Sequence, residues 1–199
     1  MISGRFKPSA GSIVFKNQNI TGKSPHLLNR MGIARSFQIT NVFQEITVFD
    51  NILSGVRCHQ GLRYHFFRRP GQVEEINSRT KKIMEEIGLT DVSDVPASAL
   101  SYGRQRALEI GITLSTDPEL ILLDEPTAGM TREETEGAIK MIDRVTAGRT
   151  LVIIEHDMDV VFSLADTISV LHYGSILASG TPEEIKNDQS VKDAYLGEG

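Results

Sequence analysis

Two adjacent carboxylates, Asp124 and Glu125, are the strongest chemical signal in the sequence, and they follow the apolar run Leu120–Leu123. Such a run is typical of a strand covered on both faces of a parallel sheet, and these sheets bind ligands at the carboxyl ends of their strands. There, one carboxylate can hold Mg²⁺ and the other can orient or deprotonate a water molecule. Taken alone, the pattern is more often a strand that ends in a solvated acidic turn.

Three further features favour the functional interpretation. The loop Leu100–Gln105 places small residues at the start of a predicted helix, where free backbone N–H groups form an anion site; in isolation it is an ordinary serine N-cap. His156 directly follows a second predicted strand, and Gln38 ends a third, with an amide that can reach a metal or a water. A lone histidine is usually structural, but this one is expected beside the end of the Asp124 strand.

The spacing of apolar residues predicts the elements that must position these groups. Strands are expected over 12–16, 33–37, 120–123, 150–154, 168–171 and 176–178, and helices over 25–30, 73–87, 103–114, 131–147 and 158–165. The fourth helix begins with the capping box Thr131-Arg132-Glu133-Glu134. Alternation of buried strands with helices implies right-handed βαβ units on a largely parallel sheet.

The composition excludes several classes of protein. The chain has 199 residues, is 40% hydrophobic and 24% charged, and carries a net charge of −5, which argues against a general nucleic-acid binder. One cysteine excludes an internal disulfide, and the histidines show no zinc-ligand spacing. No apolar run approaches the roughly 18 residues that a membrane span needs, and the first residues do not form a signal peptide, so a cytosolic location is expected.

Taken together and in this order, the motifs resemble those of the ATP-binding subunits of ABC transporters. Gln38 matches the Q-loop, Leu100–Gln105 the signature motif, Leu120–Glu125 the Walker B strand and His156 the H-loop. Ala128, Gly129 and Met130 fall where the family has its D-loop. The stretches 32–38, 100–103, 154–158, 180–185 and 194–198 look most like the branch that imports branched-chain amino acids.

The resemblance implies an α/β fold, a P-loop NTPase-like ABC ATPase core with a largely parallel sheet and a helical subdomain. The core is expected over 1–41 and 118–199 and the helical subdomain over 42–117. In the family, two subunits enclose two ATP molecules, at the cytoplasmic face of the bacterial inner membrane and against transmembrane permease subunits. Whether the partner of this chain is a second copy or a different subunit stays open, as does the transported substrate.

The resemblance also implies a role for each motif residue. Asp124 and Gln38 are expected to bind Mg²⁺, Glu125 to activate water and His156 to position the γ-phosphate. The signature residues that are expected to contact ATP held by the partner subunit are Ser101, Tyr102, Gly103 and Gln105.

The sequence departs from the family pattern in two places. No G-x-x-x-x-G-K-[ST] motif occurs, and Gly22-Lys23-Ser24 lacks its first glycine because position 17 is Asn17. The chain is therefore expected to start after the P-loop and the first strands. Arg104 stands where the family usually has glutamine.

These departures leave a second reading open, in which the chain is a non-hydrolysing fragment or regulatory subunit that only supplies its signature motif to a partner. A DNA-maintenance ABC ATPase is disfavoured, since the long heptad segments of that class are absent.

Overall fold

The computed structural model describes residues 1–36, 42–59 and 70–196. The chain divides into two compact units, residues 1–154 and 155–199, and each is considered by itself.

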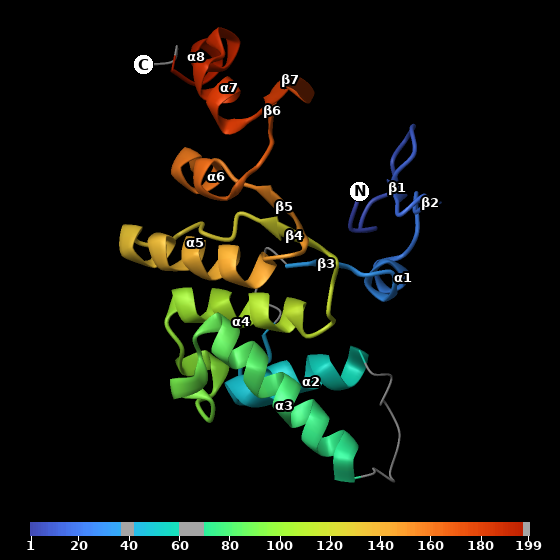
Figure 1. Ribbon diagram of the computed structural model, residues 1–199, viewed down its shortest axis with the longest axis vertical. Coiled ribbons are helices and arrows are strands. Elements are labelled where there is room, and N and C mark those ends of the chain that lie inside the picture. The colour runs from blue at the N-terminus through green and yellow to red at the C-terminus, as the bar shows by residue number, and fades with distance from the viewer. Residues whose placement is uncertain (37–41, 60–69, 197–199) are drawn as a thin grey trace. The chain divides into compact units, whose positions relative to one another are not determined.

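The first unit is built on three parallel strands, β3 (Ile33–Arg35), β4 (Leu120–Asp124) and β5 (Thr150–Ile154), in the order β3-β4-β5 (Figure 1). The predicted parallel pairing of these strands is confirmed. Residues 120 to 123 of β4 are buried, as expected for a central strand.

Strand β5 departs from the expectation of burial. Val152 and Ile154 are 38% and 62% exposed. Within the described residues, β4 is the strand that pairs with β5, so the other edge of β5 has no strand along it.

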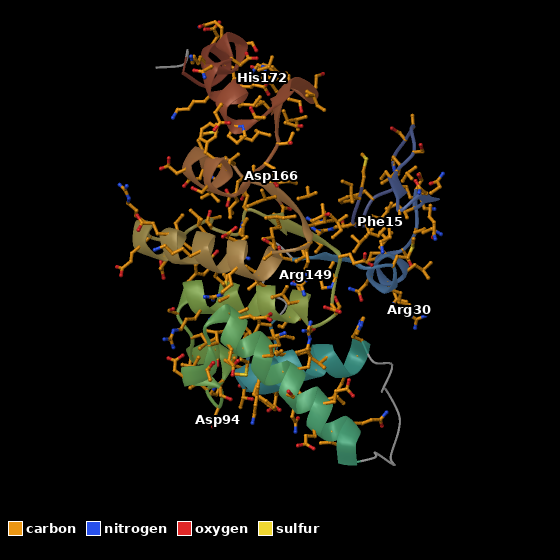
Figure 2. The ribbon with its side chains drawn as sticks, in the orientation of Figure 1. Phe15, Arg30, Asp94, Arg149, Asp166 and His172 are labelled. Carbon is orange, nitrogen blue, oxygen red and sulfur yellow. The ribbon has the colours of Figure 1, made fainter. Side chains whose placement is uncertain are left out.

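A small N-terminal layer covers one face of this sheet. It consists of the hairpin β1 (Val14–Phe15) and β2 (Gln18–Asn19) and the helix α1 (Pro25–Arg30). The cluster that joins the layer to the sheet is Ile20, Leu28, Ile33, Leu120 and Leu122, with Phe15, labelled in Figure 2, packed against it.

The strand expected over 12–16 is shorter than predicted. Lys16 and Asn17 both have positive φ, as a two-residue hairpin turn of type I′ requires, and this turn ends β1 at Phe15. Ser24 is the N-cap residue of α1, but its side chain makes no capping hydrogen bond.

Four helices complete the first unit: α2 (Val48–His59), α3 (Pro70–Ile87), α4 (Tyr102–Leu114) and α5 (Arg132–Thr146). Two short 3₁₀ turns, Thr90–Val92 and Ala97–Ala99, lie between α3 and α4. Helices α2, α3 and α4 pack against one another, α5 packs against α3 and α4, and α4 also contacts β3 (Figure 1). Gly55 allows α2 to approach α4 closely, because a Cβ there would collide with the Ser115 side chain.

The second unit contains α6 (Met158–Leu164), the hairpin β6 (Ile168–His172) and β7 (Ser175–Gly180), and the helices α7 (Pro182–Asn187) and α8 (Gln189–Leu196). Tyr173 and Gly174 form the turn of this hairpin. The core of the second unit consists of Ile168, Val170, Ile185 and Val191. In the described part of the chain, no helix has the length and apolar character needed to cross a bilayer.

Candidate functional site

The carboxyl end of β4 carries the first predicted site residue, Asp124. Arg35 pairs in register with Leu122, and side chains two residues apart in a strand share a face, so Arg35 and Asp124 project from the same face of the sheet. Arg35 Nη2 donates to Asp124 Oδ2 at 2.7 Å, and Arg35 Nη1 donates to Ser3 Oγ at 3.0 Å. Both charged side chains are largely shielded, with 22% of Arg35 and 15% of Asp124 exposed.

Glu125 marks the point where the strand becomes a loop. Its N–H donates to Ile154 O at 2.9 Å, and its φ of 47° lies in the left-handed region, which non-glycine residues rarely adopt. Ala128 N then donates to Glu125 O at 3.2 Å, which closes a turn. A strained backbone of this kind is common at functional sites.

The loop before α4 forms the second predicted site. Ser101 is the N-cap residue, but its side chain makes no capping hydrogen bond, and Ser101 and Tyr102 are exposed. Gln105 supports the loop from within, because its Nε2 donates to Leu100 O at 3.1 Å. The positive end of a helix of 13 residues is thus presented together with a serine hydroxyl, an arrangement suited to an anion.

The same loop touches the segment that follows Glu125. A Cβ built on Gly103 would lie 3.1 Å from Glu134 Oε1, and one built on Gly129 would lie 3.5 Å from the Tyr102 ring. Two predicted sites, residues 101–103 and 128–130, therefore meet in space.

Glu134 is fixed by the capping box of α5, as predicted. Thr131 N donates to Glu134 Oε2 at 2.9 Å, and Glu134 N donates to Thr131 Oγ1 at 3.4 Å. The backbone N–H of Thr131, followed by its hydroxyl, lowers the pKa of the Glu134 carboxyl.

A buried polar group on α4 was missed by sequence reasoning. Arg106 Nη1 donates to Glu109 Oε2 at 2.8 Å, and Arg106 Nη2 donates to the Tyr102 hydroxyl at 2.9 Å. Only 7% of the Glu109 side chain is exposed, and this burial raises its pKa although the hydrogen bond from Arg106 acts in the opposite direction. The signal for this group was opposite charges three residues apart on a predicted helix.

Arg104, the departure in the signature motif, has its charge paired. Its Nη2 donates to Asp91 Oδ2 at 2.9 Å, and both side chains are largely exposed. The contact joins the start of α4 to the 3₁₀ turn Thr90–Val92. The positive charge that Arg104 adds to the motif is therefore paired with a carboxylate of this chain.

Comparison with known proteins gives the family. The model of the ABC transporter family matches residues 1–128, which is more than half of the chain. The chain belongs to the ABC transporter family of ATP-binding proteins. A second model, described as branched-chain amino acid ATP-binding cassette transporter, matches residues 175–199.

Curated members of the ABC family resemble almost the whole chain. The high-affinity branched-chain amino acid transport ATP-binding protein LivG of Escherichia coli K12 is 38% identical over 99% of this chain and 80% of its own length. A probable LivG of Methanocaldococcus jannaschii is 36% identical over 100% of this chain and 80% of its own length.

Solved ABC cassettes confirm the predicted fold class. An ATP-binding cassette in its ADP conformation is 34% identical and gives a TM-score of 0.82, with 98% of this chain and 80% of that chain covered. A nucleotide-free cassette gives a TM-score of 0.80 at 32% identity with the same coverage.

Gln38 and His156 are the two remaining predicted ABC site residues. Gln38 lies outside the described residues. His156 belongs to the second unit, where 74% of its side chain is exposed and its Nδ1 lies 3.9 Å from Glu155 Oε2.

The magnesium ion expected from the family does not fit the described residues as they are arranged. Mg²⁺ is held by one or two free carboxylates together with water and substrate phosphates, whereas Asp124 Oδ2 is already bound by Arg35. Across residues 1–36, 42–59 and 70–196, no group of three or more His, Cys, Asp or Glu side chains is placed to hold a metal ion.

Proposed function

We propose that this chain is an energy-coupling ATP-binding subunit of an importer for branched-chain amino acids. The match to the branched-chain amino acid cassette model and the names of the LivG relatives support this substrate class. In this proposal the chain works as one half of a dimer of ATP-binding subunits, bound to permease subunits at the cytoplasmic face of the membrane.

The single observation that carries the proposal is the signature loop, where Ser101 and Gly103 open α4 against the start of α5. In the proposed dimer, the Ser101 hydroxyl and the N–H groups of the first turn of α4 hold the γ-phosphate of ATP bound by the partner subunit. Tyr102 and Gln105 shape this loop, Tyr102 by its contact with Gly129 and Gln105 through the carbonyl of Leu100.

Glu125 and His156 match the family's general base and phosphate-orienting residue, and we propose these roles for them in a half-site that is completed by a P-loop. Both proposals come from the family motifs, which place these residue types just after β4 and β5.

A second candidate is a subunit that supplies only its signature loop and hydrolyses nothing in its own half-site. One observation favours it: Asp124 Oδ2 accepts a hydrogen bond from Arg35.

A complementation assay tests the proposal. An intact subunit of the family, such as E. coli LivG, is inactivated in its own signature motif and then mixed with this chain. We expect the chain to restore ATP hydrolysis, and the same chain carrying Gly103→Asp to fail, because a carboxylate would face the phosphate. If the two chains co-elute as a dimer and no hydrolysis returns, the proposal is wrong.

A further inference from the structure

We propose that Arg35 is the resident counter-ion of Asp124 and excludes divalent cations from this carboxylate. The inference goes beyond the proposed function, since it concerns an ion pair within this chain and does not depend on the transported substrate or on the partner.

The sheet register holds the pair in place. Arg35 lies opposite Leu122, so its side chain reaches diagonally to Asp124 along one face of the sheet. The cluster of Ile33, Leu120 and Leu122 covers the same face below the pair and restricts water on that side. An ion pair that is held in a shielded position is screened less than one at the surface.

Ser3 fixes the guanidinium from its other end. Arg35 uses Nη2 for Asp124 and Nη1 for Ser3 Oγ, so it is held by two partners, from β4 and from the N-terminal segment. Because arginine stays protonated at any physiological pH, it competes with metal ions under all such conditions.

A second ion pair of the first unit, between Arg79 and Asp117, differs from the Arg35–Asp124 pair in the exposure of its carboxylate. Arg79 Nη2 donates to Asp117 Oδ1 at 2.9 Å, but 62% of Asp117 is exposed, against 15% of Asp124. A cation can approach Asp117 from solvent beside its two arginines, Arg79 and Arg149. At the shielded Asp124 it meets the positive charge of Arg35 at the carboxylate itself.

Paramagnetic broadening by Mn²⁺ tests the proposal without any enzymatic activity. The full chain is labelled with ¹⁵N, and Mn²⁺ is added while the amide signals of Asp124 and Glu125 are followed. We expect Arg35→Gln to reach half-broadening at a Mn²⁺ concentration at least about tenfold lower than the wild type, since a fixed positive charge has been removed.

Three variants complete the design. Arg35→Lys keeps the charge and should behave like the wild type, and Arg79→Gln is the matched control that should leave the signals of Asp124 and Glu125 unchanged. Asp124→Asn combined with Arg35→Gln should abolish the gain, which identifies Asp124 as the ligand.

The proposal is overturned if the wild type and Arg35→Gln broaden at the same Mn²⁺ concentration. It is also overturned if Arg35→Gln shows no broadening at Asp124 while exposed carboxylates elsewhere are broadened. If circular dichroism shows that Arg35→Gln does not fold, Ser3→Ala is measured in its place. We expect Ser3→Ala to reach half-broadening at a lower Mn²⁺ concentration than the wild type, and an unchanged concentration overturns the proposal.

Discussion

Gly103 and Glu134 lie so close together that a methyl group on Gly103 would come within 3.1 Å of the Glu134 carboxylate. Gly103 belongs to the signature loop, and Glu134 to the capping box that begins α5. The loop proposed to face the phosphate of a partner's ATP is therefore supported by the helix that follows the Walker B strand.

Thr131 stabilises the start of α5 through the capping box that it forms with Glu134. Thr131→Ala removes the hydroxyl that accepts from Glu134 N, and we expect the free energy of unfolding to fall by about 1 kcal/mol, as for other N-caps. Urea denaturation measures the change. Thr90→Ala, at an exposed position, is the control and should stay within about 0.5 kcal/mol of the wild type. Equal losses in both variants would contradict the capping role.

The buried carboxyl of Glu109 predicts a pH dependence of stability. Burial raises the pKa of Glu109 above its ordinary value of 4.5, so the folded chain keeps this proton to a higher pH than the unfolded chain does. The contribution of this proton to the free energy of unfolding is complete below the pKa that Glu109 has in the unfolded chain. It is lost as the pH rises through the pKa that Glu109 has in the folded chain. Glu109→Gln removes this loss, so its stability relative to the wild type should be higher at pH 7 than at pH 4.

Urea unfolding of both proteins at the two pH values checks this sign. Glu85→Gln, at an exposed position, is the control variant. If Glu109→Gln instead loses stability relative to the wild type as the pH rises, the ionised carboxylate is favoured by Arg106 more than it is disfavoured by burial.

How much the sequence predicts depends on the range of the interaction. Leu120–Leu123 and the capping box at Thr131 are local patterns, and both were predicted correctly. Helix α2 was not predicted, although its apolar residues Val48, Ile52 and Val56 recur at helical spacing; they are buried where α2 packs against α3 and α4. The resemblance to a family identified the motif residues, but the contacts between them depend on the fold.

The ion pair at Asp124 shows where sequence reasoning stops. Arg35 and Asp124 are 89 positions apart, and only the register of β3 against β4 brings them together. In the same way, Asp91 pairs with Arg104 because a 3₁₀ turn lies beside the start of α4, which no residue pattern indicated.

We expect the 199-residue chain alone to bind MgATP with a Kd above about 1 mM. The backbone N–H groups and lysine of a P-loop supply most of the phosphate contacts in such sites, and the sequence contains no such motif. Isothermal titration calorimetry, with an intact LivG as the positive control, measures this affinity. Micromolar binding by this chain would contradict the prediction.

Strand β5 predicts an apolar surface that binds dye. Ile154 is 62% exposed on a strand whose outer edge no described strand covers, and such edges promote association. Ile154→Lys should lower both the fluorescence of a bound apolar dye and the scattering of concentrated solutions. Leu27→Lys, at a position on α1 that is 47% exposed, is the control. An equal effect of the two variants would show that the dye does not report on β5.

The most direct test of the proposed role of the signature loop is the steady-state ATPase rate of a mixed dimer of this chain and an intact subunit, with substitutions placed in this chain only. Ser101→Arg should abolish most of the turnover, since its bulk displaces the phosphate held by the partner, whereas Glu125→Gln should barely change it, because the general base of that site comes from the partner. A large loss from Glu125→Gln, with Ser101→Arg tolerated, would show that this chain holds the phosphate in its own half-site and would contradict the account.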